Sequence, residues 1–284
     1  MKIEFLGTGG AVTIPRPMCR CHVCVEARKR GVPYSRSGPG VYVHGPNLLI
    51  DTSEDIYMQL NRSGVERIDA VTYSHWHPDH VMGRRVLESM SGDFRRWPPD
   101  VKPCDVILPE QVAADFEERL AGAEHLRYFE SQGFIRQRTL TDGESYSSNG
   151  AVITPIRLAE DYVYAFSIAE SDKRALIAMD EMFGWVPDPD LAGVDLAVLP
   201  AGIFEHHPIT GERQIHEAHP VLKMEATFAQ TLAIIERLNP RLTLLTHIEE
   251  MDGLGYDDLQ QVEALLAESG RNIKFAYDTL VVEV

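Results

Sequence analysis

Four side chains that commonly bind metal ions fall within six residues of this sequence. They are His75, His77, Asp79 and His80, in the segment 72–80, which reads TYSHWHPDH. Imidazole nitrogens suit zinc, iron and related metals, and a carboxylate also tolerates harder ions. In an extended segment alternate residues face the same way, so His75 and His77 can converge on one ion. Asp79 and His80 begin a turn and a helix and point to a neighbouring position, so this loop predicts two adjacent metal sites.

A second group of metal-binding residues lies nearer the N-terminus. Cys19, Cys21 and Cys24 form a Cys-x-Cys-x-x-Cys motif. Thiolates at such short spacing commonly hold a structural zinc ion, with a fourth ligand from elsewhere. We therefore expect a cysteine-rich zinc loop at about residues 15–38, in which His22 is one candidate for the fourth ligand. Cys104 stands alone and is expected to pack in the core.

The composition limits the compartment and the partners of the protein. The chain has 284 residues and a formal net charge of -16. Phosphate contacts need clustered Lys and Arg, so the sequence predicts no nucleic-acid partner. The first residues are too charged for a signal peptide, and no apolar run approaches the ~20 residues of a membrane helix. We expect a cytoplasmic protein with reduced cysteines, no membrane association and a small-molecule substrate, and a homodimer is left open.

The elements that must position these residues alternate between strands and helices. Expected strands cover residues 3–6, 41–43, 48–50, 70–73, 106–108, 134–140, 152–158, 162–169, 175–179, 196–199, 242–245 and 273–284. Expected helices cover residues 56–60, 81–90, 111–120, 224–238 and 257–267. Both halves have the same rhythm, and no linker separates them. This pattern predicts one α/β domain over residues 1–284, a four-layer αββα sandwich.

The segment 72–80 resembles the signature of the metallo-β-lactamase superfamily. The resemblance implies that Asp51, directly after the strand 48–50, supports the metal loop from behind. It further implies that Asp180, after the strand 175–179, bridges two metal ions. A last metal ligand, His247, follows the strand 242–245 in the same way.

One family ligand is missing from the sequence. The family usually has a histidine on a strand before the bridging aspartate, but the matching stretch 154–161 contains none. Glu160 stands about where that histidine would be, and Asp161 is adjacent. A carboxylate there would favour harder ions such as Mn²⁺ or Fe²⁺, and the alternative is a weak or empty first site. The expected ligands of two divalent ions (Zn, Mn or Fe) are therefore His75, His77, Asp79, His80, Glu160, Asp180 and His247.

The leaving-group side of the site is also unusual. Related phosphodiesterases often carry a catalytic histidine near the start of the helix before the last strand. In this sequence His219 and Lys223 are the candidates for a phosphate clamp or a general acid. Asp79 is a further catalytic candidate, because it could orient the nucleophile. His206, His207 and His216 in the same long loop could line the pocket.

The cysteine and histidine motifs together resemble the branch of the superfamily that contains PhnP and PqqB. This resemblance implies a fourth zinc ligand shortly after the last metal histidine, where Glu250 stands. It implies a metal-dependent hydrolase, with a phosphodiesterase acting on a small cyclic or diester phosphate through a metal-activated hydroxide as the leading prediction. A lactone, ester or thioester hydrolase with the same metals and a PqqB-like iron-dependent oxygenase are the alternatives.

Overall fold

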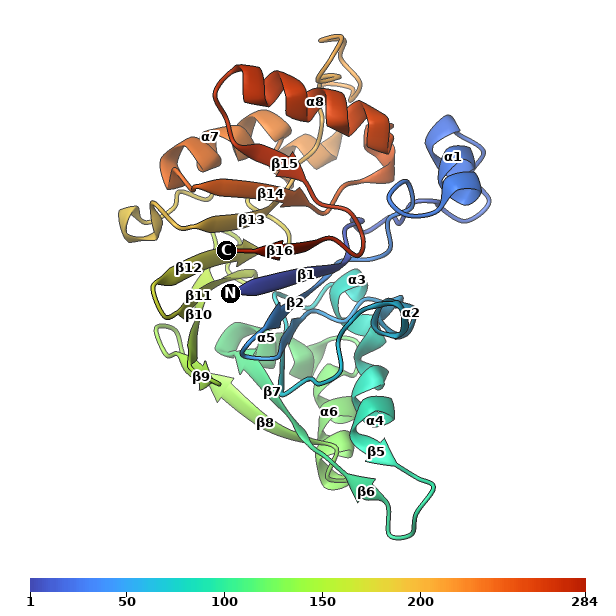
Figure 1. Ribbon diagram of the computed structural model, residues 1–284, viewed down its shortest axis with the longest axis vertical. Helices are drawn as coiled ribbons and strands as arrows, with labels where there is room; N and C mark the ends of the chain where they lie inside the picture. The colour runs from blue at the N-terminus through green and yellow to red at the C-terminus, as the bar shows by residue number, and fades with distance from the viewer.

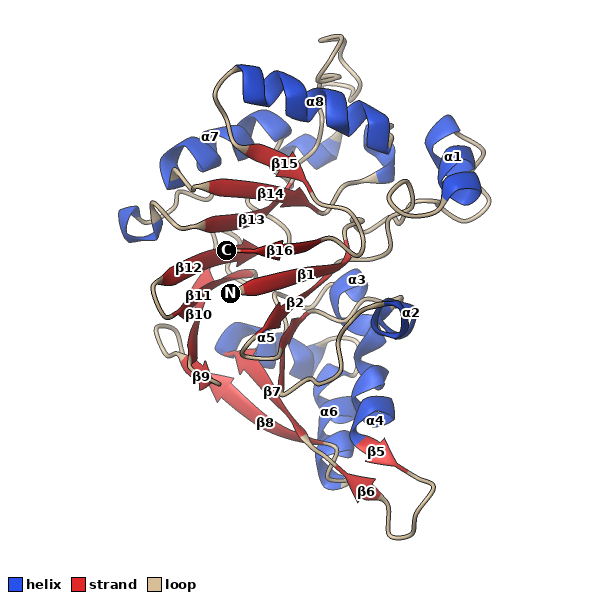
Figure 2. Cartoon of the chain, in the orientation of Figure 1, coloured by secondary structure: helices blue, strands red, loops and turns tan.

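Two seven-stranded β-sheets packed face to face form the centre of the protein (Figure 1). The computed structural model describes residues 1–284. Helices lie outside both sheets, with α7 and α8 over one sheet and α4, α5 and α6 beside the other (Figure 2). The predicted αββα sandwich is therefore confirmed.

The first sheet has the strand order β16-β1-β2-β3-β4-β7-β8. Its strands are β1 (Lys2–Gly7), β2 (Gly40–His44), β3 (Leu48–Ile50), β4 (Ala70–Thr72), β7 (Cys104–Pro109), β8 (Ile135–Leu140) and β16 (Val281–Glu283). The pairs from β3 to β8 are parallel, so β3 and β4 end at the same edge of the sheet. A separate hairpin, β5 (Gly92–Asp93) with β6 (Asp100–Val101), projects away from the sandwich (Figure 1).

The second sheet has the order β15-β14-β13-β12-β11-β10-β9. Its strands are β9 (Tyr146–Ser148), β10 (Ala151–Arg157), β11 (Tyr164–Glu170), β12 (Lys173–Ala178), β13 (Leu196–Pro200), β14 (Leu242–Thr246) and β15 (Ile273–Phe275). The strands β12, β13, β14 and β15 are parallel. The loops that follow β12 and β14 therefore leave from one edge.

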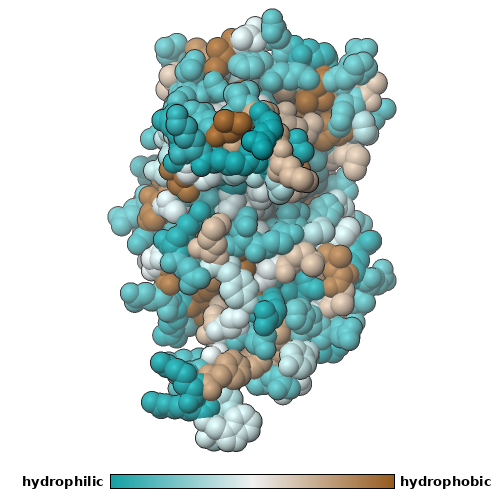
Figure 3. All heavy atoms as spheres, turned by 90° about the vertical axis from the view of Figure 1, so that its right-hand side faces the viewer, coloured by the Kyte–Doolittle hydropathy of each residue, from teal (hydrophilic) through white to brown (hydrophobic).

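Eight α-helices and four 3₁₀ turns connect the strands. The helices are α1 (His22–Arg30), α2 (Ile56–Arg62), α3 (Pro78–Val81), α4 (Val86–Ser91), α5 (Glu110–Glu118), α6 (Gly122–Ser131), α7 (Phe228–Leu238) and α8 (Tyr256–Glu268). The 3₁₀ turns are η1 (Met82–Arg85), η2 (Pro189–Leu191), η3 (Pro220–Lys223) and η4 (Glu250–Asp252). No helix has both the length and the apolar character needed to cross a bilayer. On the face where α1 lies, hydrophilic side chains predominate and the hydrophobic ones form small separate areas (Figure 3).

Apolar packing joins the layers. A cluster of 40 buried residues combines side chains of both sheets, such as Phe5 and Phe166, with α5 and α6 residues such as Phe116. A second cluster of 24 buried residues packs α7 and α8 against the second sheet. A small third cluster, made of Ile14, Val23, Ala27 and Tyr34, anchors α1. Apolar burial contributes roughly 25 cal/mol per Å² to the free energy of folding. The two large clusters therefore stabilise the packing of the sheets from which the ligand-bearing loops leave.

Some predicted elements differ from the observed ones. The expected helix 81–90 is divided into the end of α3, η1 and α4, where Gly83 approaches the backbone so closely that a Cβ would lie 1.9 Å from the Ser53 carbonyl oxygen. The expected helix 224–238 begins only at Phe228, because Thr227 caps it through a reciprocal pair of hydrogen bonds with Gln230. The helices α1 and α6 and the strands β5, β6 and β9 were not expected. The expected strand 273–284 is divided into β15 and β16, which belong to different sheets.

Candidate metal centre

The potential ligands leave four strands at the junction of the two sheets. Asp51 directly follows β3, and the segment 73–80 follows β4 in the same sheet. Asp180 follows β12 and His247 follows β14 in the second sheet. Residues that are far apart in the sequence therefore meet, because the chain leaves parallel strands at the same edge.

The structure gathers six of the expected ligands into two groups of three. His75, His77 and Asp180 each offer a ligand atom within 4.8 Å of the other two. The second group, with the same spacing, is Asp79, His80 and His247. One oxygen of Asp180, Oδ2, lies 3.5 Å from His75 Nε2 and 3.6 Å from His80 Nε2. The Asp180 carboxylate thus stands between the two groups, where a bridging ligand would stand.

Four of these ligand atoms are buried and have no hydrogen-bond partner. They are His75 Nε2, Asp79 Oδ2, His80 Nε2 and His247 Nε2. A buried polar atom without a partner typically costs about 1–3 kcal/mol. Divalent ions between the groups would satisfy all four atoms at once. The mixture of imidazole and carboxylate donors fits Zn²⁺, Mn²⁺ or Fe²⁺, so the residues present suit a two-metal site.

Asp51 lies behind this centre and is completely buried. Its carboxylate accepts hydrogen bonds from the Ser74 backbone N–H and the Ser74 hydroxyl, each at 2.7 Å. It also lies 2.7 Å from His80 Nδ1. A carboxylate at this nitrogen places the ring proton on Nδ1 and leaves Nε2 free for a metal ion. Asp51 has a φ of +63°, an uncommon conformation for a residue other than glycine, so the surrounding fold must impose it.

Charged side chains within the centre shift one another's pKa values. Burial opposes the charged imidazole, but Asp180 and Asp79 outweigh it and raise the pKa of His247 to about 10. The pKa of His80 is also raised well above its usual value, because Asp79 and Asp51 outweigh burial. In return, His80 and His247 hold the pKa values of Asp79 and Asp180 below their usual range, against the effect of burial. Asp79 and Asp180 are therefore ionised, and their negative charges favour a bound cation.

The remaining two histidines stay neutral. Burial, followed by the neighbouring His80, lowers the pKa of His75 well below its usual value. Burial also lowers the pKa of His77. Neutral imidazole is the form that binds metal, so these two side chains are ready to act as ligands.

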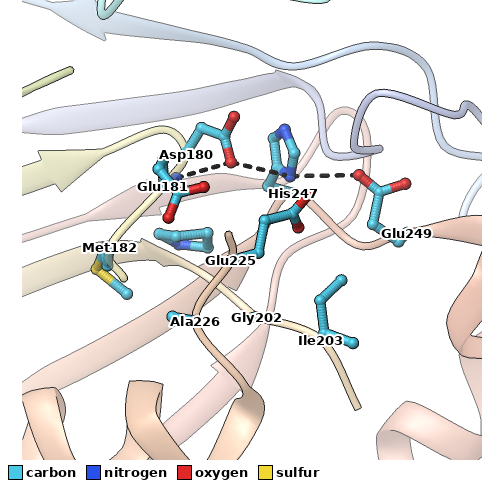
Figure 4. A pocket seen from close by; sticks show the side chains of 10 residues that line it. Asp180, Glu181, Met182, Gly202, Ile203, Glu225, Ala226, His247 and Glu249 are labelled. Atoms are coloured by element: carbon cyan, nitrogen blue, oxygen red, sulfur yellow. Dashed lines mark hydrogen bonds and ion pairs between the residues drawn. The ribbon is translucent and has the colours of Figure 1, made fainter. Parts of the chain in front are cut away.

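A narrow pocket opens beside Asp180 and His247 and contains carboxylates that the sequence analysis missed (Figure 4). Glu181, Glu225 and Glu249 surround the imidazole there. Burial, followed by the charge of Asp180, raises the pKa of Glu181 to about 8 and that of Glu225 to about 7. Neither glutamate belongs to a recognisable motif. The full lining is Asp180, Glu181, Met182, Pro200, Gly202, Ile203, Glu225, Ala226, His247 and Glu249.

His219 and Lys223, the expected clamp or general acid, do not lie at this pocket. Both side chains are exposed at η3. The His219 imidazole instead accepts a hydrogen bond from the Val221 backbone N–H at 3.2 Å and caps its own turn. The segment turns inward only two residues after Lys223, so the residues that it contributes to the pocket are Glu225 and Ala226.

The other histidines of the long loop also have local roles. His207 Nδ1 accepts from the Ile209 N–H at 3.2 Å, and His216 Nδ1 accepts from the Ala218 N–H at 3.1 Å. His206 is exposed. None of the three lines the pocket beside the metal centre.

Glu160, the expected replacement for the missing histidine, belongs to neither group of ligands. It is half-buried in the turn between β10 and β11. The side chain that covers the first group is Tyr162, whose ring centroid lies 5.6 Å from that of His77 and 6.1 Å from that of His75. Burial, followed by Glu160, raises the pKa of Tyr162 to about 12, so the phenol keeps its proton. A tight turn between two paired strands, not a sequence motif, places this ring.

The cysteine loop forms a separate four-residue cluster with Glu250. Glu250 Oε1 lies 3.1 Å from Cys19 Sγ and 3.4 Å from both Cys21 Sγ and Cys24 Sγ. Ligands at about 2.0–2.3 Å from a tetrahedral zinc ion are separated by similar distances. His22 is not part of this cluster. Cys104 is buried in the core, as expected.

Comparisons with known proteins agree with this geometry. A family model described as the beta-lactamase superfamily domain matches residues 46–248. A ribonuclease Z of Archaeoglobus fulgidus is 30% identical over 182 residues, which cover 61% of this chain and 49% of that protein. The chain spans at most about half the length of the curated relatives that it matches.

Two solved structures share the fold over the whole chain. A diphosphatase of the PhnP family has a TM-score of 0.72 at 23% identity, with 100% of this chain and 98% of that chain covered. Zinc-bound PqqB of Methylobacterium extorquens has a TM-score of 0.71 at 17% identity, with both chains covered completely.

Proposed function

The chain belongs to the metallo-β-lactamase superfamily, and on this basis we propose that it is a metal-dependent phosphodiesterase acting on a small cyclic or diester phosphate. The observation that carries this proposal is the pair of ligand groups with Asp180 between them. Paired metal sites are typical of enzymes that displace an oxygen at phosphorus, such as phosphatases and nucleases. The names of two similar proteins, a ribonuclease and a diphosphatase, also denote cleavage at phosphate.

The ligand groups and the side chains around them have separate roles in the proposed reaction. Divalent ions bound by the two groups would lower the pKa of a water molecule to about 7 and stabilise negative charge on the phosphoryl oxygens. Asp51 keeps His80 in the orientation that ligation requires. Asp79 Oδ2 lies 3.2 Å from His80 Nε2 and faces the centre, where it can orient the attacking water. Glu225, in the pocket beside His247, is placed to pass a proton to the leaving oxygen.

Hydrolysis of bis-p-nitrophenyl phosphate tests the proposal. We expect protein loaded with Mn²⁺ or Zn²⁺ to release p-nitrophenolate, and we expect His77→Ala to reduce the rate to background because the first group loses a ligand. His216→Ala is the matched control, since His216 caps a surface turn outside the site. If the metal-replete protein were inert on a broad panel of phosphodiesters, the phosphodiesterase assignment would be wrong.

The same protein preparation separates the alternatives. A lactone, ester or thioester hydrolase would act on carbonyl substrates and leave the diesters intact. An oxygenase with a single iron would consume O₂ only when loaded with iron, but two adjacent groups of three ligands favour a two-metal hydrolase over a single-ion centre. The net charge of -16 and the carboxylates around the pocket favour a small substrate over an RNA. Cleavage of a transfer-RNA precursor would contradict this choice of substrate class.

A further inference from the structure

We propose that Glu249 is a positioning residue for the ligand His247, and that the cysteine cluster holds Glu249 in place through the adjacent Glu250. The two metal sites of the protein are then coupled. This inference rests on the metal centre of the proposed function, but not on the substrate.

Glu249 lies beside His247 at the pocket, and backbone N–H groups hold its carboxylate. Its Oε1 lies 3.7 Å from His247 Nδ1 (Figure 4). The same oxygen accepts a hydrogen bond from the Ala11 N–H at 2.9 Å, and Oε2 accepts from the Val12 N–H at 3.4 Å. The side chain is buried. Gly10 makes room for it, because a Cβ at Gly10 would lie 2.0 Å from Glu249 Oε1.

Two anchor points fix the segment 247–250 against the N-terminal loop. On one side of Glu249, the Ile248 N–H donates to the Thr8 carbonyl at 3.0 Å, and the Gly10 N–H donates to the Ile248 carbonyl at 3.3 Å. On the other side, Glu250 contacts all three clustered thiols at 3.1–3.4 Å. Its second oxygen lies 3.2 Å from Arg16 Nε. Glu249 therefore sits between a backbone bridge and the cysteine cluster.

The local backbone of His247 makes external support necessary. His247 has a φ of +51°, a conformation that residues other than glycine rarely adopt and that persists only when the surroundings impose it. Two carboxylate oxygens flank His247 Nδ1, Glu249 Oε1 at 3.7 Å and Asp180 Oδ1 at 3.6 Å. Glu249 thus limits the position of the ring by charge and packing, without the direct 2.7 Å hydrogen bond that Asp51 makes with His80. Thiol groups hold Glu250 only through S–H···O hydrogen bonds of 3.1–3.4 Å, whereas an ion bound by the three cysteines and Glu250 would fix the carboxylate much more tightly. Loss of that ion would weaken the second anchor. Glu249 and His247 would then lose their fixed orientation.

Cobalt binding tests the coupling because the two sites have different colours. Thiolate-to-Co²⁺ charge transfer in the near ultraviolet reports the cysteine cluster, and the visible bands of Co²⁺ with nitrogen and oxygen ligands report the catalytic centre. In the full-length protein Glu250→Ala leaves three cysteines in the cluster, so we expect cobalt to bind there more weakly, with the thiolate band appearing only at higher cobalt concentration. We also expect cobalt binding at the catalytic centre to weaken by roughly tenfold to a hundredfold, the usual loss for a residue that supports a ligand. Glu249→Gln should weaken the catalytic centre alone.

The control is Glu217→Gln, an exposed glutamate outside both sites, which should change neither band. Should Glu250→Ala fail to fold, Cys21→Ser removes a more exposed ligand of the same cluster and carries the same expectation. A variant whose cysteine cluster binds cobalt more weakly, but whose catalytic centre binds cobalt as tightly as the parent, would overturn the coupling. Because the readout is metal binding, failure of phosphodiester hydrolysis leaves this result intact.

Discussion

Among single residues, Asp51 shows how a carboxylate outside both groups of ligands can support the candidate centre. Asp51 accepts hydrogen bonds from both the backbone and the side chain of Ser74, and its third contact is His80 Nδ1. Asp51 is completely buried, so these contacts lie in a low-dielectric environment. There, removal of the carboxylate charge or reversal of a hydrogen bond changes the interaction energy strongly.

Asp51→Asn should weaken metal binding by roughly tenfold to a hundredfold. The amide would donate a hydrogen bond to His80 Nδ1, so the ring proton would move to Nε2, the atom that faces the centre. Competition with a chromogenic chelator measures the change. Asp195→Asn, a substitution at a surface residue that pairs with Lys173, is the control and should bind metal normally. Unchanged affinity in Asp51→Asn would exclude the orienting role.

Metal binding at neutral pH should release protons, on the order of two per centre, from His80 and His247. Both histidines have raised pKa values in the metal-free protein, that of His247 to about 10, and both must be neutral to bind metal. Apparent metal affinity should therefore rise between pH 6 and about pH 10. Calorimetry in buffers with different ionisation enthalpies counts the protons, and equal heats in all buffers would contradict the expectation.

At the scale of elements, the N-terminal loop and α1 have little core of their own. Four buried side chains form their cluster, and Arg28 adds a hydrogen bond from its guanidinium to the Arg16 carbonyl at 2.6 Å. A structural ion would therefore supply much of the energy that orders this element, since metal binding energy becomes folding energy when the unfolded chain lacks the site.

Cys24→Ser should reduce the zinc content by about one ion per chain and lower the melting temperature, because three ligands hold zinc less tightly than four. Elemental analysis and thermal unfolding measure the two effects. Cys104→Ala is the control for zinc content, since Cys104 lies in the core away from the cluster. Full zinc content in Cys24→Ser would show that Cys24 is not a ligand.

At the scale of the whole molecule, the metal centre connects the two sheets. Asp51 and the segment 73–80 follow strands of the first sheet, and Asp180 and His247 follow strands of the second. Each group of three ligands contains residues from both sheets. Ions bound here would therefore stabilise the sandwich in addition to the apolar packing between the sheets.

Removal of the metal ions should lower the stability of the whole protein. An ion present at a thousand times its dissociation constant adds about 4 kcal/mol. We expect a chelator to decrease the melting temperature and added Mn²⁺ or Zn²⁺ to restore it. The shift should be smaller in His77→Ala, which lacks one ligand. A melting temperature that does not respond to metal would show that the ions do not bridge the sheets.

The αββα fold class, the alternation of strands and helices and the two local clusters of metal-binding residues could all be predicted from the amino-acid sequence. Segment 72–80 and the cysteine motif are recognisable because their side chains are neighbours along the chain, where spacing alone decides which face they share. Asp180, His247 and Glu250 followed from the family resemblance, and the structure brings all three to the expected groups.

The remaining residues of the site become apparent only in the folded protein. Tyr162 instead of Glu160 covers the first group, and Glu225 instead of His219 or Lys223 reaches the pocket. Glu249 lies beside His247 in the same pocket. These side chains come from turns and loops whose paths depend on strand pairing and helix capping many residues away. No local periodicity encodes such a path, because the contacts that determine it form only when both sheets are packed.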